Sequence, residues 1–222
     1  MPANDSIETA LSREKQQRLN GLYAITDSTL TPEATIRVQV EQALAGGARI
    51  IQYRDKSKDQ IKRKQQASEL LALCEAFSAT LIINDDPELA ADVNAHGVHL
   101  GLTDSPIEHA RALLGQDAII GATCHGSIDN AREAITLGAD YVAFGRFFPS
   151  ATKPDAEPAQ LANIEPHLST LAVPAVAIGG ITLANAPQLR AAGFAMLAVV
   201  GDIFQNEDIA NQSQRYAQLF QS

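Results

Sequence analysis

The sequence has no tryptophan, few aromatic residues and only two cysteines, Cys74 and Cys124. Two cysteines are too few for the disulfide framework of a small secreted domain, so we expect both to be free thiols in a reducing compartment. No apolar run approaches the roughly 20 residues of a membrane span. The first residues also lack the apolar core of a signal peptide. Together these absences predict a cytoplasmic protein with no membrane partner.

Positive charge is also scarce, with 17 Lys and Arg residues against 26 Asp and Glu residues and a net charge of −9. A nucleic-acid-binding protein usually carries a basic stripe, and this sequence shows none, which predicts no nucleic-acid partner. The negative net charge does not exclude small anionic ligands, because a few cations and a metal ion can make the potential of one pocket positive.

What the sequence does contain suits a parallel sheet covered by helices. Hydrophobic residues make up 45% of the 222 residues, and Ala, Val, Ile and Leu fill most of the apolar positions. This length fits a single barrel domain.

Short β-rich runs alternate with helical patterns, one run every 20 to 30 residues or so, which is the length of a βα unit. Eight such units predict an α/β fold, a single-domain (βα)8 TIM barrel over residues 21–222, with residues 1–20 as an N-terminal extension. We expect that extension to be a tail or an extra helix over the barrel bottom. An open doubly wound sheet is the alternative, but none of the runs has the polar or proline-interrupted character of an edge strand. The expected strands are Gly21–Thr26, Ile50–Arg54, Thr80–Asn84, Gly97–Leu100, Ala118–Thr123, Tyr141–Gly145, Ala175–Gly180 and Met196–Gly201.

The helix boundaries carry their own signals. Thr31 and Asp86 each stand directly before a proline, and Asp104 stands two residues before Pro106, where a side-chain cap and a first-turn proline begin a helix. Glycines that can close a helix in a left-handed conformation follow the helical patterns at Gly46-Gly47, Gly115, Gly138 and Gly193.

Polar residues cluster where the strands end, which is where a TIM barrel carries its chemistry. After the second strand, Gln52, Arg54 and Lys56 share one parity and face the barrel mouth, whereas Ile51 and Tyr53 face the helices. Arg and Lys in one place can bind phosphate oxygens. A surface cluster of salt bridges is the alternative interpretation of this segment.

Asp85 and Asp104 each follow a neighbouring strand. Two carboxylates over one pocket repel each other unless a proton or a cation lies between them, and Mg²⁺ prefers such oxygen ligands. Helix capping is the alternative for each of them. Because Asp86 directly precedes Pro87, we assign the cap to Asp86, which leaves Asp85 for the metal.

A second anion site is indicated by the loop after the sixth strand and by the glycines that end the seventh and eighth strands. The loop carries hydroxyls and Lys153 between Pro149 and Pro154, and phosphate groups in barrels often lie near the last two strands. Adjacent Cys124 and His125 point to opposite faces and are poorly placed as a nucleophile and base. His96 and His99 lack the further ligands that zinc needs.

The chain resembles the bacterial thiamine phosphate synthase family from about Gly21 to Phe204. The segments that carry the resemblance are Gly21 to Asp27, Gln52 to Lys56, Asn84-Asp85, His99 to Gly101 with Asp104, Ser150 to Lys153, and Ala177 to Ile181. Together these segments are specific, although each alone is weak. The chain departs from the usual family pattern at Ser150, at Arg146 and at Gly201, where many members have Thr, Pro and Ser.

The resemblance implies an enzyme that transfers a pyrimidinylmethyl group from an aminopyrimidine diphosphate to a thiazole phosphate, with one Mg²⁺ per subunit. Asp85 and Asp104 would bind the metal, and Arg54, Lys56 and Lys153 would act on the leaving diphosphate. The pyrimidine diphosphate would contact Gln52, Tyr53, Arg54, Asp55, Lys56, Asn84, Thr123 and Lys153. The thiazole phosphate would contact Ser150, Ala151, Thr152, Gly180, Val200 and Gly201.

Other classes of barrel remain as alternatives. A thiazole tautomerase generally lacks both the loop with hydroxyls and Lys and the metal carboxylates, which this chain has. A sugar-phosphate isomerase or epimerase would need a catalytic acid–base pair, and the two aspartates could form one. A non-catalytic barrel that binds thiamine phosphate would not need a full set of cations and metal ligands. The sequence is compatible with a homo-oligomer as well as with a monomer.

Overall fold

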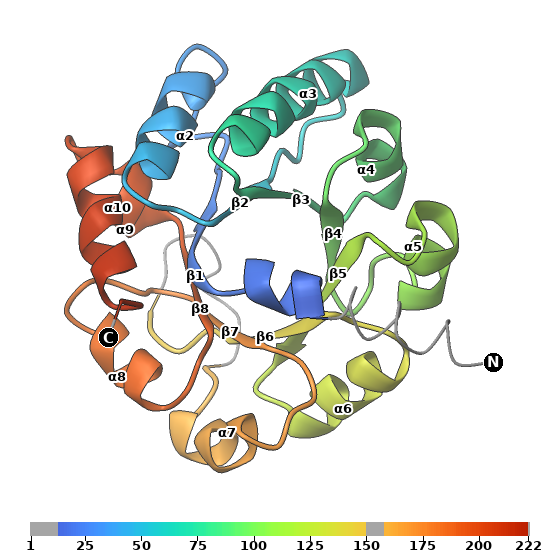
Figure 1. The fold of residues 1–222 in the computed structure, drawn as a ribbon, viewed down its shortest axis with the longest axis vertical. Coiled ribbons are helices and arrows are strands. Elements are labelled where there is room, and N and C mark those ends of the chain that lie inside the picture. The colour runs from blue at the N-terminus through green and yellow to red at the C-terminus, as the bar shows by residue number, and fades with distance from the viewer. Residues whose placement is uncertain (1–12, 150–157, 222) are drawn as a thin grey trace.

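The computed structural model describes residues 13–149 and 158–221. Eight parallel strands close into a barrel in the order in which they occur along the chain, and helices surround it (Figure 1). This confirms the predicted TIM barrel. The strands are β1 (Gly21–Ile25), β2 (Ile50–Tyr53), β3 (Thr80–Asn84), β4 (Gly97–Leu100), β5 (Ile119–His125), β6 (Tyr141–Gly145), β7 (Ala175–Ile178) and β8 (Met196–Val199).

Helices follow the strands and cover the outside of the barrel, as the ring in Figure 1 shows. Within the described ranges, no helix combines the length and the apolar character needed to cross a membrane. The helices are α2 (Ile36–Ala45), α3 (Gln60–Ala76), α4 (Pro87–Val93), α5 (Ile107–Leu114), α6 (Ile128–Thr136), α7 (Leu161–Leu168), α8 (Ala186–Ala191), α9 (Gly201–Phe204) and α10 (Ile209–Gln218).

Strand alternation sorts the apolar residues into two layers. One layer fills the space between the barrel and the helices, and the other fills the barrel interior. Leu19 belongs to the interior layer and is 1% exposed, although it precedes the first strand. Residues 13–18 just before it are helical and lie across the barrel in Figure 1. Lys15 pairs at 3.0 Å with Asp140, which precedes β6, so this segment covers the end where the strands begin.

The structure tests the three predicted helix caps. Asp86 caps α4 as expected, with its carboxylate accepting from the Leu89 N–H at 2.8 Å. The prediction for Thr31 is wrong, because α2 begins only at Ile36 and the Thr31 hydroxyl donates to the Asp27 carbonyl at 2.9 Å. The prediction for Asp104 as a cap is also wrong, because Pro106 is the cap residue of α5. The carboxylate of Asp104 is therefore not committed to a helix start.

Candidate active site

The inward-facing residues at the carboxyl ends of β2, β4 and β5 meet inside the barrel mouth. The side-chain amide of Gln52 donates to the Tyr23 hydroxyl at 2.7 Å, so Gln52 faces inward as predicted. His99 and Thr123 lie 2.9 Å apart, from Nε2 to Oγ1. These three residues are far apart in the sequence. Strand parity and barrel closure bring them together at the carboxyl ends of the strands, where TIM barrels carry their functional sites.

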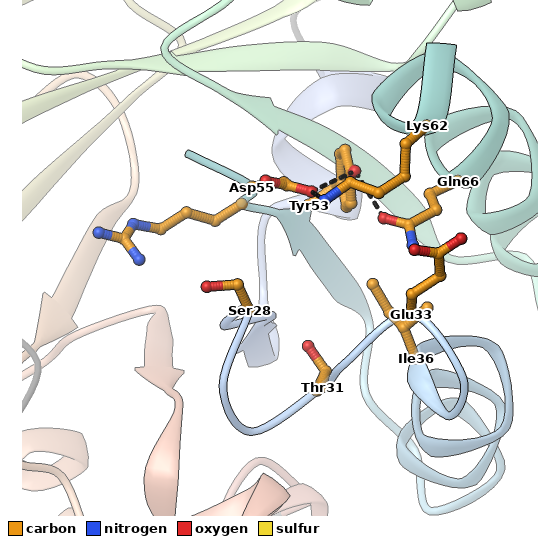
Figure 2. Close-up of a pocket in the computed structure, with 9 residues that line it drawn as sticks. Ser28, Thr31, Glu33, Ile36, Tyr53, Asp55, Lys62 and Gln66 are labelled. Carbon is orange, nitrogen blue, oxygen red and sulfur yellow. Dashed lines mark hydrogen bonds and ion pairs between the residues drawn. The ribbon is translucent and has the colours of Figure 1, made fainter. Parts of the chain in front are cut away.

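The run after β2 divides between the two sides of the strand. Tyr53 faces the helices, as predicted, and its hydroxyl donates to Gln66 of α3 at 2.8 Å. Asp55 forms an ion pair with Lys62 at 2.6 Å (Figure 2). Burial opposes the charge of Asp55, but the hydrogen bonds from Lys62 and from the Ser57 N–H outweigh it and lower the pKa of this carboxyl. Tyr53 and Asp55 thus hold the segment against α3.

Arg54 lies next to the loop that follows β1. Its backbone N–H donates to the Thr26 hydroxyl at 2.9 Å, and its guanidinium lies 3.5 Å from the Asp27 carboxylate. Sequence reasoning gave Asp27 no role. The small pocket in Figure 2 lies between this loop and α3, and its polar lining residues are Ser28, Thr31, Glu33, Tyr53, Arg54, Asp55, Lys62 and Gln66.

Asp85, Asp104 and Lys56 form one charged cluster at the mouth. Lys56 forms an ion pair with Asp85, and the carboxyls of Asp85 and Asp104 share a hydrogen bond. Burial would raise the pKa of Asp85, but Lys56 and the hydrogen bond to Asp104 lower it below its ordinary value. For Asp104, burial and the neighbouring Asp85 raise the pKa. Lys56 thus favours the charged form of Asp85, whereas the charge of Asp85 disfavours the charged form of Asp104.

This carboxyl pair fits Mg²⁺. Two neighbouring carboxylates repel each other unless a proton or a cation lies between them, and one or two protein carboxylates are usual for Mg²⁺ bound with phosphates. The backbone of Asp85 is left-handed, with a φ of 62°, and its N–H donates to the His99 carbonyl at 2.8 Å. A non-glycine residue held in this region is common at functional sites.

The predicted thiazole phosphate residues divide by where they lie in the chain. Ser150, Ala151, Thr152 and Lys153 lie outside the described residues. Gly180 has a φ of 63° after β7, and an added Cβ there would overlap the carbonyl oxygen of Pro149. The Leu183 N–H donates to the carboxylate of Asp202 at 3.2 Å, which joins the loop after β7 to α9. Val200 and Gly201 thus lie beside the Gly180 loop, with Gly201 as the first residue of α9 rather than the end of β8.

Three functional candidates were missed by the sequence interpretation. Tyr23, Tyr141 and His99 form a hydrogen-bonded series inside the barrel, with Tyr23 Oη 2.8 Å from Tyr141 Oη and Tyr141 Oη 2.9 Å from His99 Nδ1. Their common signal in the sequence is a polar group at an inward position of a strand. The resemblance covered Tyr23 and His99 but gave them no role.

Within residues 13–149 and 158–221, the cysteines and remaining histidines form no second site. Cys124 is buried and His125 is exposed, so they do not face each other, as predicted. His96 accepts from the Leu81 N–H at 3.0 Å. In the part of the chain that the structure describes, no three His, Cys, Asp or Glu side chains are grouped so as to hold a metal ion.

The two thiols are expected to be inert in the folded protein. Burial raises the pKa of Cys74 and of Cys124 to about 12, so only a minute fraction of either is thiolate at neutral pH. Treatment with iodoacetamide at pH 7.5, followed by mass spectrometry, should show no alkylation of the native protein and two alkylated cysteines after unfolding in guanidinium. Fast alkylation of Cys124 in the native state would contradict this placement.

A closed parallel barrel whose mouth carries cations, a carboxyl pair and glycine-rich strand ends defines the class of phosphate-binding TIM barrels. The chain matches the family model described as thiamine monophosphate synthase over residues 22–203. It belongs to that family.

Similar proteins agree with this assignment. The thiamine-phosphate synthase of Marinobacter nauticus is 52% identical over 202 residues, which cover 90% of each chain. The thiamine-phosphate synthase of Thioalkalivibrio sulfidiphilus is 49% identical and covers 94% of this chain and 99% of its own. Among solved structures, the thiamine phosphate pyrophosphorylase of Pyrococcus furiosus superposes with a TM-score of 0.83 at 32% identity, over 92% of this chain and 96% of that one. A 3-hexulose-6-phosphate synthase at 17% identity, with a TM-score of 0.63, shares the fold alone.

Proposed function

We propose that this protein is a Mg²⁺-dependent thiamine phosphate synthase. It joins 4-amino-2-methyl-5-(diphosphooxymethyl)pyrimidine to 4-methyl-5-(2-phosphoethyl)thiazole, or to the carboxylated form of that thiazole, and releases diphosphate, together with CO2 when the thiazole is carboxylated. The observation that carries the proposal is the charged cluster of Lys56, Asp85 and Asp104 at the mouth of a barrel that belongs to this family. A thiazole tautomerase or a regulatory barrel has no need of this cluster.

The main task of the protein side chains is to stabilise the negative charge that develops on the leaving diphosphate. The bond between the pyrimidine methylene carbon and the diphosphate oxygen breaks, and its electron pair leaves with the diphosphate. Lys56, Arg54 and Lys153 stabilise the negative charge that develops on this leaving group. Asp85 and Asp104 would hold Mg²⁺, which neutralises part of the same charge when it is bound.

The thiazole nitrogen then donates its lone pair to the pyrimidine methylene carbon and forms the new carbon–nitrogen bond. This step moves no proton, which agrees with the lack of a paired nucleophile and base among the described residues. Backbone N–H groups around Gly180 and Gly201 hold the thiazole phosphate, together with the hydroxyls of Ser150 and Thr152. Asn84 and Gln52 contact the pyrimidine diphosphate.

The proposal is tested with the purified protein and its two substrates. Incubation with Mg²⁺ should yield thiamine phosphate and diphosphate in equal amounts, and EDTA should abolish both. Isomerisation of the carboxylated thiazole phosphate without any pyrimidine would instead identify a tautomerase. Binding of thiamine phosphate without turnover would identify a regulatory protein. We further propose that the enzyme is cytoplasmic, with one Mg²⁺ per subunit.

Substitution of Gly201 is expected to act on one substrate only. A Cβ at Gly201 would meet the side chain of Gln205 at 3.4 Å, an ordinary contact, so the fold accepts a larger residue there. Gly201→Val should raise the KM for the thiazole phosphate about tenfold by obstructing the backbone donor, and leave the pyrimidine diphosphate KM nearly unchanged.

Gly201→Ser is the matched control, because it adds a side chain that can donate to phosphate. It should keep the KM for the thiazole phosphate within about twofold of the native value. Steady-state kinetics with each substrate varied in turn decides the question. An equal loss for both substrates in the Val variant would show that Gly201 only begins α9.

A further inference from the structure

One carboxylate connects three segments of the chain beyond the ends of β7 and β8. Asp202 is the second residue of α9, and its Oδ2 atom accepts three hydrogen bonds. The donors are the Leu183 N–H at 3.2 Å, the side-chain amide of Gln212 at 2.8 Å and the Tyr216 hydroxyl at 2.6 Å. Leu183 belongs to the loop after β7, whereas Gln212 and Tyr216 belong to α10. We call these four residues the Asp202 tether.

The α10 side of the Asp202 tether is buried. Tyr216 is fully buried, and Gln212 is 6% exposed. Burial and the neighbouring Asp202 raise the pKa of Tyr216, so its hydroxyl stays protonated and serves as a donor. The same hydroxyl lies 3.4 Å from the Ile181 carbonyl oxygen, and it therefore also reaches the loop after β7 directly. Buried donors are costly when they lose their acceptor, which favours the tethered arrangement.

The tether joins the two segments that carry the backbone donors assigned to the thiazole phosphate. β7 and β8 are neighbours in the barrel, and Ile178 pairs with Ala198 near their carboxyl ends. Gly180 follows the end of β7 by two residues, and Gly201 follows the end of β8 by two residues. Asp202 comes directly after Gly201. The tether therefore fixes the spacing between the Gly180 loop and Gly201.

This spacing matters because backbone donors cannot adjust by rotation. A hydroxyl group turns toward its acceptor, whereas a backbone N–H moves only together with its segment. Gly201 has no side chain that could compensate for a displaced N–H. Hydrogen bonds weaken steeply when their geometry departs from the ideal, so two segments that share one phosphate have to keep a fixed relative position.

We propose that Asp202 is a positioning residue for the thiazole phosphate, which holds the loop after β7 at a fixed distance from Gly201 so that the backbone donors of both segments converge on one phosphate group. Asp202 acts through Leu183 and through the two α10 side chains, and it does not touch the substrate. Helix α10 thereby becomes part of the support of the site. The inference rests on the proposed function, since that function supplies the thiazole phosphate.

The first test separates the two substrates by steady-state kinetics. Asp202→Ala removes the acceptor from all three donors, and its KM for the thiazole phosphate should rise about tenfold, while the KM for the pyrimidine diphosphate stays within about twofold. Asp202→Asn keeps an oxygen acceptor in the same place. The Oδ1 atom that its amide nitrogen would replace has no hydrogen-bond partner among the residues that the structure describes. The Asn variant should therefore restore the thiazole phosphate KM to within about threefold of the native value.

Asp140→Ala is the matched control. The Asp140 carboxylate also accepts from one backbone N–H, that of Ile120 at 2.8 Å, and from two side chains, Lys15 at 3.0 Å and Arg111 at 2.6 Å, but at the end of the barrel where the strands begin. This variant should lower the melting temperature and leave both KM values within about twofold. An equal KM change for both substrates in Asp202→Ala, or the same selective change in Asp140→Ala, would overturn the proposal. A fall of the thiazole phosphate KM in both Asp202 variants would show that the carboxylate acts through its charge, and would overturn it too.

Tyr216→Phe tests the proposal if Asp202→Ala fails to fold. It removes one of the three donors, so the thiazole phosphate KM should rise about threefold, and a native value in the folded variant would overturn the proposal. The second measurement needs no substrate. Hydrogen exchange followed by NMR should show that the Leu183 N–H of the native protein exchanges slowly although it lies in a loop. Exchange at the rate of an unprotected amide would overturn the proposal. Native protein that does not join the two substrates would contradict the proposed function, whereas the exchange at Leu183 is measured independently of it.

Discussion

Replacing Asp104 with asparagine is expected to lower kcat/KM roughly 10²- to 10³-fold, which is the usual loss when one group that stabilises transition-state charge is removed. The Asp104 carboxylate accepts from the Gly101 N–H at 2.7 Å, and an asparagine side-chain oxygen can accept from the same donor. Because Pro106 caps α5 in its place, the fold should tolerate the change. Asp85→Asn should cause a loss of similar size, because it removes a metal ligand and the partner of Lys56.

The matched control is Asp86→Asn, one residue away from Asp85. Asp86 caps α4 and forms an ion pair with Arg63 at 2.8 Å. Asparagine can still cap the helix, so the substitution removes only the ion pair and should lower the free energy of unfolding by at most about 1 kcal/mol. It should leave the Mg²⁺ dependence of turnover unchanged. Mg²⁺ titrations of activity and thermal melts separate the two effects. If Asp85→Asn and Asp104→Asn both keep near-native activity in EDTA, the metal assignment is wrong.

The strands could be predicted closely because each is a short apolar run between helical patterns. Three of the eight have the expected bounds, namely Thr80–Asn84, Gly97–Leu100 and Tyr141–Gly145. The end of β5 could not be predicted in this way, because it depends on pairing with β6, where the register shifts between Thr123 and His125. The start of α2 was also missed, because the Thr31 hydroxyl bonds within the preceding loop instead of capping the helix.

The site residues that strand parity alone orients could be predicted from the sequence. The contacts between side chains of distant strands could not. Strand parity predicts that Gln52 faces inward and that Tyr53 faces α3. It does not predict that Tyr23 of β1 reaches Tyr141 of β6, since 118 residues separate them and barrel closure alone brings them together. Likewise, the pairing of Arg54 with Asp27 depends on how the loop after β1 folds back toward β2.

Replacing Lys56 with alanine is expected to lower kcat about 100-fold, because Lys56 is a cation next to the metal carboxylates where the leaving diphosphate gains charge. The side chain of Lys56 is 58% exposed, and an exposed ion pair contributes at most about 1 kcal/mol to folding. The melting temperature should therefore change little. A fall in kcat that exceeds the rise in the pyrimidine diphosphate KM would show that Lys56 acts mainly in the transition state.

Lys64→Ala is the matched control for this substitution. Lys64 lies on α3, its side chain is 55% exposed, and it pairs with Asp92 at 3.0 Å, away from the barrel mouth. Lys64→Ala also removes an exposed ion pair. Any kinetic difference between the two variants therefore reflects the position of the lysine relative to the site. We expect native kinetics for Lys64→Ala across ionic strengths. A Lys56→Ala enzyme with native kcat and a raised KM would assign Lys56 to ground-state binding, and identical kinetics in the two variants would remove Lys56 from the site.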